Sequence, residues 1–312
     1  MNGTAPQIQI IAPFQAAFEW MKAMLFRPFD FAKWLTVAFA AFIAGNLGGS
    51  GGGNFSRLGR LGNGDWKYRS YSYGNGPHWD ATPLFIALII VAVIIALVVA
   101  VVLMWVSARG KFIFTDCIVK NRGAISEPWR EYRREGNSYF LFSVVVAIGM
   151  MFLAAVTVVV VVLPLASSST DGPAKAVFVI LAIFLGVVWL AVIIVFSLIS
   201  HFMVPVMYRR RCSAREAFVD VAKLISRHLG PFILFVLFGI ALAVAVAVVG
   251  TMLACATCCI GGLPYVSTVL LLPAIVWLAT FKLLFIRQFG DQYDVWANAA
   301  AVAPSTLPPA AL

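Results

Sequence analysis

The chain has 312 residues, of which 62% are apolar and only 12% are charged, and its formal net charge is +10. So little charge cannot cover the surface of a soluble protein of this length, and the mean hydropathy of +0.94 points to a membrane protein. The apolar residues form long runs, not alternating segments of about ten residues, so we expect an all-α bundle of membrane-spanning helices and not a β-barrel.

We expect no cleavable signal peptide, because Met1–Pro13 lacks both a basic leader and a small-residue cleavage site. We therefore expect the first span to act as an internal signal anchor. Before it, residues 14–28 place Phe14, Phe18 and Met21 on one side of a helix, and this amphipathic pattern predicts a helix in the membrane interface.

Six spans follow from the charge-free runs, since a span needs roughly 20 apolar residues. Pro273 falls inside the last span and predicts a kink, which is tolerated where a neighbouring helix satisfies the freed carbonyl. The predicted spans lie at 31–47, 83–107, 138–164, 173–203, 231–258 and 264–289.

The outer segment at 48–81 is rich in Gly, Asn, Ser and Tyr, which predicts a mobile loop. Its Gly48–Gly53 run is not a phosphate loop, because no Lys-Ser/Thr pair follows it. The tyrosines and arginines of this loop have two interpretations, seating in the membrane interface or binding a polar ligand.

Two further interfacial helices are predicted at 124–136, where Gly136 ends the helix, and at 214–229. The recurring order of interfacial helix and spans suggests a threefold internal repeat, which places Phe112 opposite Phe202 and Lys120 opposite Arg210. Such repeats occur in transporters, but they arise equally where a stable bundle is duplicated.

Most Lys and Arg residues fall on the side of the membrane that holds the N-terminus, and the positive-inside rule then places both termini in the cytoplasm. The positive charge thus reflects orientation in the cytoplasmic (inner) membrane of a bacterium and predicts no nucleic-acid partner. We expect a basic cluster on the cytoplasmic face to bind anionic lipid headgroups. Its residues are Arg209, Arg210, Arg211, Arg215, Lys223 and Arg227.

Cys255, Cys258 and Cys259 form the one notable cysteine cluster, at the outer end of the fifth span. Their Cys-x-x-Cys spacing occurs in zinc and thiol-exchange sites, but zinc needs four ligands and the outer hairpin offers no His, Asp or Glu. We interpret them as small packing residues near a tight turn, with a disulfide or thiol cluster as the alternative. No metal and no cofactor is expected.

Ionisable residues that mark a transport path are nearly absent from the predicted spans, since no Asp or Glu lies in their interior. Lys33 and Lys282 fall near span ends, and His201 lies close to the end of the fourth span. This pattern disfavours a proton-coupled carrier. The three histidines fall on both sides of the membrane and no hydrolase motif occurs, so an enzyme is not expected.

Four short motifs carry a resemblance to a known group. They are Phe29–Leu35, Gly110–Asp116, Cys258–Tyr265 and Gln288–Tyr293. With them the chain resembles, over residues 13–295, an uncharacterised prokaryotic family of six-span membrane proteins. That group is similar to the membrane domain fused to some bacterial glycerophosphodiester phosphodiesterases. The resemblance implies a six-helix bundle with interfacial helices and proximity to lipid metabolism. No phosphodiesterase activity carries over, because the catalytic domain is missing.

We therefore expect one membrane domain at 1–295 and a disordered Ala/Pro-rich tail at 296–312. The leading functional hypothesis is a non-enzymatic module that organises lipids of the bilayer, a partner protein or copies of itself. The alternative is a transporter or lipid translocator that uses the repeats for alternating access.

Overall fold

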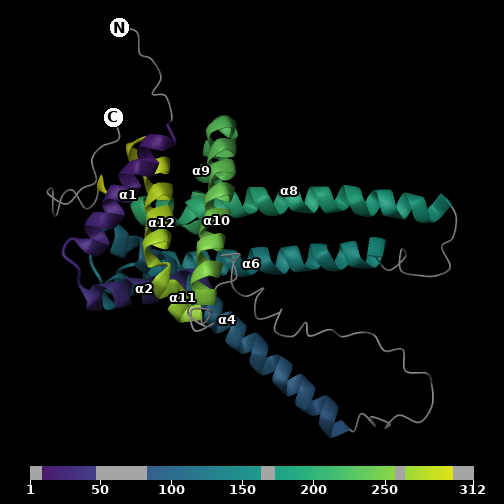
Figure 1. Cartoon of the computed structure of the whole chain (residues 1–312). Coiled ribbons are helices and arrows are strands. Elements are labelled where there is room, and N and C mark those ends of the chain that lie inside the picture. Colours follow the sequence, from purple (N-terminus) through teal and green to yellow (C-terminus); the bar gives the residue numbers. More distant parts are fainter. Residues whose placement is uncertain (1–8, 47–82, 163–172, 257–263, 298–312) are drawn as a thin grey trace.

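The computed structural model describes residues 9–46, 83–162, 173–256 and 264–297, and all regular elements in this part of the chain are helical (Figure 1). The all-α prediction is confirmed. In chain order the elements are α1 (Ile11–Phe26), α2 (Phe31–Asn46), α4 (Pro83–Val119), α5 (Ser126–Glu131), α6 (Arg133–Thr157), η1 (Val158–Val162), α8 (Pro173–Arg210), α9 (Ala214–Arg227), α10 (Leu229–Ala256), α11 (Pro264–Leu270), α12 (Leu272–Arg287) and η3 (Asp291–Tyr293).

Four stretches of helix are long and apolar enough to cross a membrane, and they make this a multi-pass membrane protein. Their outward side chains are apolar and exposed, as in Phe152 at 71% and Ile180 at 67%, which suits contact with acyl chains. The four stretches are Ile86–Val119, Arg133–Val161, Ala176–Arg210 and Leu229–Leu253.

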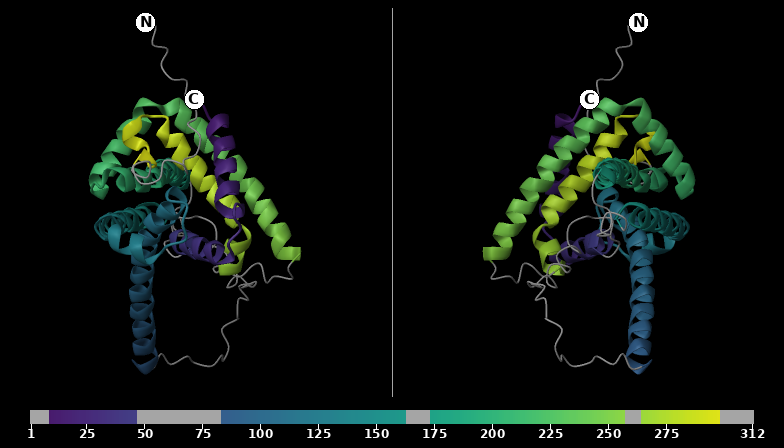
Figure 2. Two further views of the ribbon diagram at one scale, coloured as in Figure 1. Left: turned by 90° about the vertical axis from the view of Figure 1, so that its left-hand side faces the viewer. Right: turned by 90° about the vertical axis from the view of Figure 1, so that its right-hand side faces the viewer.

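The long helices diverge from one another away from their packed ends (Figures 1 and 2). α6 and α8 run side by side, and there the Trp189 indole N–H donates to Thr157 Oγ1 at 3.2 Å. α4 extends in another direction from both. The apolar middles of these helices therefore face mainly outward, as the exposed valines and isoleucines of α4 and α8 show.

The core lies at the end of the long helices where α4 and α8 finish and where α6 and α10 begin. Its largest buried side chains include several phenylalanines, and the Phe232 ring lies 5.3 Å from Phe202 and 5.5 Å from Phe285. Trp296 is also buried there, 6.4 Å from Trp20. Trp296 was predicted to belong to the disordered tail at 296–312, and in the structure it is packed in the core. Residues 298–312 of that predicted tail and the predicted loop at 48–81 lie outside the described residues.

Two of the six predicted spans are not single long helices in the structure: the first is short and the sixth is divided. α2 has only 16 residues, and the sixth span is divided into α11 and α12 at Leu271. The division has a clear cause: Pro273 has no N–H to donate to the Val269 carbonyl four residues earlier. The Trp34 indole N–H donates to that carbonyl instead, at 3.3 Å. The predicted kink and its compensation by a neighbouring helix are both present.

The helices α1 and α9, which were predicted to lie in the membrane interface, turn their apolar faces toward the protein. α1 lies along α12, and the rings of Phe14 and Phe18 pack 4.5 and 5.0 Å from Trp277. In α9, Ala217 and Val221 are fully buried. A capping box between Ser213 and Glu216 begins this helix, as its N-terminal sequence favours.

The middle interfacial helix is shorter than predicted. α5 ends at Glu131, Tyr132 breaks the helix, and Gly136 lies inside α6, so the prediction that Gly136 ends a helix at 124–136 is wrong. The reason for a glycine there is close packing: a Cβ at Gly136 would lie 2.9 Å from Arg109 Cγ. The Arg109 guanidinium lies over the rings of both Trp105 and Trp129, at 4.4 and 4.9 Å from their centroids.

Candidate functional site

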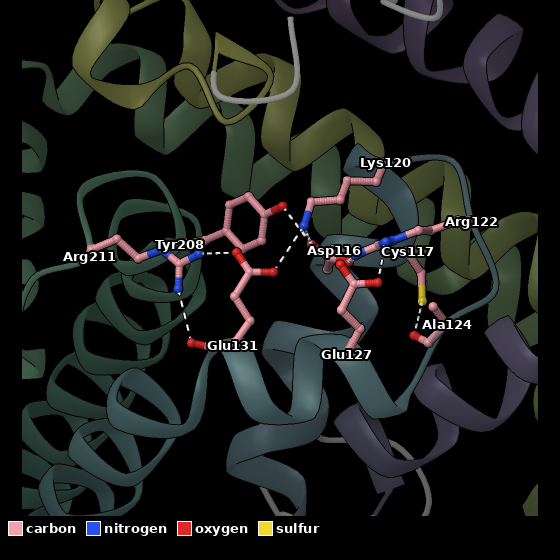
Figure 3. A network of polar contacts seen from close by, with 9 residues as sticks. All are labelled: Asp116, Cys117, Lys120, Arg122, Ala124, Glu127, Glu131, Tyr208 and Arg211. Atoms are coloured by element: carbon pink, nitrogen blue, oxygen red, sulfur yellow. Dashed lines mark hydrogen bonds and ion pairs between the residues drawn. The ribbon is translucent and has the colours of Figure 1, made fainter. Parts of the chain in front are cut away.

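The most concentrated polar chemistry of the described residues lies where α4 and α8 end. There the Asp116 carboxylate is fully buried and accepts hydrogen bonds from three side chains (Figure 3). Tyr208 Oη donates at 2.9 Å, Lys120 Nζ lies at 2.8 Å, and Arg122 Nη2 lies at 3.1 Å. We call these four residues, with Glu127, Glu131 and Arg211 around them, the Asp116 network.

The outer part of the network connects α5 to both long helices. Glu131 binds Lys120 at 3.1 Å and also pairs with Arg211, while Arg122 binds Glu127 at 2.7 Å (Figure 3). Because Lys120 and Arg122 follow α4 directly and Arg211 follows α8, these ion pairs tie the two helix ends to α5.

The backbone at both helix ends helps to place these side chains. Asn121 and Arg211 each adopt a left-handed conformation, with φ of 50° and 53°. After α4 the Arg122 N–H reaches back to the Cys117 carbonyl at 3.2 Å, which satisfies an otherwise unpaired carbonyl and turns the chain toward α5. The same turn brings Arg122 back to Asp116, at 3.1 Å.

An aromatic stack packs against the Asp116 network. The Tyr132 ring lies parallel to Tyr208 at 4.7 Å and to Phe112 at 6.0 Å, and the Arg211 guanidinium covers Tyr132 at 3.9 Å. Flat guanidinium and aromatic groups attract each other at this separation, so Arg211 stabilises the aromatic stack in addition to forming its ion pair with Glu131.

The charges within the network hold its outer groups ionised. Burial favours the neutral form of Glu131, but its hydrogen bond to Lys120 and the charges of Lys120 and Arg211 lower its pKa below the ordinary value. Burial likewise opposes the charge of Arg122, yet Glu127 and Asp116 raise the pKa of this guanidinium. Because protein donors surround the buried Asp116, this carboxylate joins helices and is not open to a ligand.

The predicted basic cluster divides into paired and exposed residues. Arg210 pairs with Asp220 and Arg211 with Glu131, so these two arginines serve contacts within the protein. Arg209 is half-buried. The remaining three are exposed and form no ion pair within the described residues: Arg215, Lys223 and Arg227.

The predicted thiol cluster is described only at Cys255, which is exposed and near the end of α10, because Cys258 and Cys259 lie outside the described residues. In the ranges that the structure covers, no group of His, Cys, Asp and Glu side chains could hold a metal ion. Cys117 is fully buried, and its Sγ lies 3.5 Å from the Ala124 carbonyl.

The Asp116 network was missed from the sequence because the second and fourth spans were predicted to end at residues 107 and 203. α4 and α8 continue to Val119 and Arg210, so Asp116 and Tyr208 lie within helices. One signal was available: Asp116 and Lys120 are four residues apart, a spacing that pairs opposite charges on a helix. Their partners on α5 and α8 follow from tertiary packing alone.

Comparisons with known proteins identify a family whose function is unknown. A model described as a family of unknown function (DUF7544) matches residues 8–303, which is nearly the whole chain. No curated protein matches the chain, and no solved structure matches it either.

Proposed function

We propose that this chain, a member of the DUF7544 family of unknown function, is a non-enzymatic module that organises anionic lipids in the cytoplasmic membrane. The observation that carries the proposal is the exposed basic face of α9, formed by Arg215, Lys223 and Arg227. The competing occupant of that face is a partner protein or a second copy of the chain.

The position of α9 favours lipid. It connects the end of α8 to the start of α10, and both helices are long enough to cross a membrane, so α9 stays close to the membrane surface. Its apolar face is buried in the core, which turns the opposite, basic face outward. Exposed lysines and arginines near an anionic surface contribute roughly 1 kcal/mol each to membrane binding.

We place six spans in the membrane by adding α2 and the α11–α12 pair to the four long helices, with both termini in the cytoplasm. A threefold repeat is part of this proposal. Its support is that Asn121 and Arg211, which the alignment of the second and third units pairs, both adopt left-handed backbone conformations within two residues of the end of a long helix. Phe112 and Phe202, another aligned pair, are both fully buried. Proximity to lipid metabolism, as in the phosphodiesterase-fused membrane domains, is also proposed.

The test replaces Arg215, Lys223 and Arg227 by Gln and measures retained lipid. The full chain is reconstituted in nanodiscs of phosphatidylcholine with phosphatidylglycerol, and the lipids that remain bound are counted by native mass spectrometry. We expect at least tenfold weaker retention of phosphatidylglycerol, with the difference shrinking at high salt, because three surface charges of roughly 1 kcal/mol each are lost.

The matched control removes the same charge from the exposed Arg130, Arg133 and Arg134 and should retain the lipid. Equal losses in both variants would mean a general effect of net charge, and unchanged retention in the α9 variant would refute the proposal. A protein retained in fixed ratio by the wild type and lost from the α9 variant would identify a partner instead.

The second candidate is a transporter or lipid translocator, and the division of the sixth predicted span at Leu271 favours it. Discontinuous helices often form the moving or binding parts of transporters. Movement of labelled lipid across proteoliposomes by the purified protein would support this function, whereas a passive module moves none.

A further inference from the structure

The basic face of α9 is a single stripe along the helix, and its regular spacing limits the lipids that it can hold. Arg215, Lys223 and Arg227 are separated by eight and by four residues, so they lie on one i, i+4 line, with Val219 between the first two. All four side chains are exposed, Val219 at 46%. We call these four residues the α9 stripe.

The acidic residues of α9 do not neutralise the stripe. The Asp220 carboxylate pairs with Arg210, and the Glu216 carboxylate accepts from the Ser213 backbone N–H at 3.4 Å, as part of the capping box. Within the described residues, no carboxylate lies at ion-pair distance from the three cations of the stripe. The positive charge of the α9 stripe is therefore available to a ligand.

The cations occupy two separate places on the stripe. Lys223 and Arg227 are neighbours one helical turn apart, with about 6 Å between them. A phosphate group that lies between these two is about 15 Å from Arg215 along the helix axis, which is too far for a direct contact. A second phosphate group, joined to the first by a short linker, can reach Arg215. The spacing therefore favours a lipid with two phosphate groups on one headgroup.

The stripe adjoins the apolar surface that α6 and α8 expose. Phe218 lies three residues after the first cation of the stripe, and its ring packs on Phe142 of α6 at 5.4 Å and on Phe196 of α8 at 6.2 Å. α6 and α8 run side by side (Figure 1), and the adjacent side chains of Leu141 and Val195 are exposed. A lipid whose headgroup is held by the α9 stripe can therefore lay its acyl chains on both helices.

We propose that the α9 stripe selects lipids that carry two phosphate groups on one headgroup, as cardiolipin does, over lipids that carry one. Each phosphate meets one cationic place of the stripe, and the second contact forms within a molecule that is already held, so it needs no second lipid. Such a lipid also brings twice as many acyl chains to the apolar surface of α6 and α8. The inference rests on the proposed function, because it names the lipid class for the same site.

The experiment compares two kinds of nanodisc with equal phosphate charge. One contains phosphatidylcholine with phosphatidylglycerol, and the other contains phosphatidylcholine with half as many cardiolipin molecules. Lipids retained by the full chain are counted by native mass spectrometry. We expect the wild type to retain cardiolipin about tenfold better per phosphate, because the linked second phosphate binds at a high effective concentration.

The matched variant moves one cation without changing the composition. Lys223→Ser combined with Ser226→Lys exchanges two exposed residues, so the net charge is kept. The lysine then directly precedes Arg227 in the sequence, and residues i and i+1 do not face each other on a helix. We expect this variant to retain phosphatidylglycerol like the wild type but to lose the preference for cardiolipin. Lys223→Arg keeps the cation in place and should keep the preference.

The results separate this inference from the proposed function. Equal retention of the two lipids per phosphate by the wild type, or a preference that survives the exchange, overturns the inference and leaves the proposed function in place. A wild type that retains neither lipid refutes both. If the exchanged chain does not fold, Arg215→Gln tests the same point, because it removes the distant cation and should abolish the preference for cardiolipin.

Discussion

The Asp116 carboxylate, which lies on α4, accepts from one side chain of α8 and from two side chains of the loop that follows α4, so a single buried residue connects three segments. Removing the charge and removing one donor are different perturbations. Without the carboxylate, Lys120 and Arg122 lose the buried anion between them, whereas without the Tyr208 hydroxyl the carboxylate still has both cations. The charge should therefore matter more than the hydroxyl.

We predict that Asp116→Asn lowers the free energy of unfolding by about 3 kcal/mol and that Tyr208→Phe lowers it by about 1–2 kcal/mol. The measurement is unfolding in mixed micelles by titration with a denaturing detergent. Tyr208→Phe keeps the stacked ring beside Tyr132, so its loss isolates the hydrogen bond. A larger cost for Tyr208→Phe than for Asp116→Asn would show that the Tyr208 hydrogen bond and not the buried charge holds the helix ends.

At the scale of the helix, the junction of α11 and α12 shows how a backbone defect is satisfied from a distance. The Val269 carbonyl loses its usual donor because of Pro273 and gains the indole of Trp34, which is far away in the sequence. Trp34 also packs beside Phe26 and Phe29, with ring centroids at 5.5 and 5.7 Å. A phenylalanine at position 34 keeps much of this packing and removes only the donor.

We predict that Trp34→Phe costs about 1 kcal/mol of stability in the wild-type background and less in a Pro273→Ala background, where the restored N–H can donate to Val269. A double-mutant cycle in the same unfolding assay gives the coupling. Equal costs in the two backgrounds would mean that the indole contact contributes nothing to the junction.

Apolar runs and turn residues predicted where the long helices lie, whereas the helix ends and the contacts between helices depend on tertiary packing. The long charge-free stretches correctly indicated α4, α6, α8 and α10, because a membrane span can be recognised from its apolar composition alone. Helix ends were harder to predict. Charges after residue 107 suggested that a helix stops there, whereas Arg109 lies inside α4 and its guanidinium packs on the rings of Trp105 and Trp129. Gly136 resembles a helix end in sequence but serves close packing against Arg109.

The candidate sites also contain some features that the sequence predicts and others that depend on tertiary packing. Exposed Arg215, Lys223 and Arg227 follow from charge and helical spacing alone. The pairing of Arg210 and Arg211 does not, since their partners Asp220 and Glu131 are chosen by how α8 meets α9 and α5.

For the whole molecule, the proposed orientation places α9 and the ends of α4 and α8 in the cytoplasm and the far end of α10 outside. A helix of 28 residues is about 42 Å long, enough to carry its two ends to opposite sides of a membrane. Two exposed positions report on those sides: Cys255 near the outer end of α10, and Ser226 near the end of α9 that leads into it.

We predict that a membrane-impermeant maleimide labels a variant whose only cysteine is Cys255 on intact cells, whereas a variant whose only cysteine comes from Ser226→Cys is labelled only after permeabilisation. The other cysteines are replaced by Ser or Ala in both variants, and labelling is read from the purified protein. The physical reason is the uneven distribution of Lys and Arg, which resist transfer across the membrane and hold their side of the bundle in the cytoplasm. Labelling of both positions on intact cells would show that α10 does not cross, and labelling of Ser226→Cys alone would reverse the orientation, place the basic face of α9 outside, and remove it from the anionic leaflet that the proposed function requires.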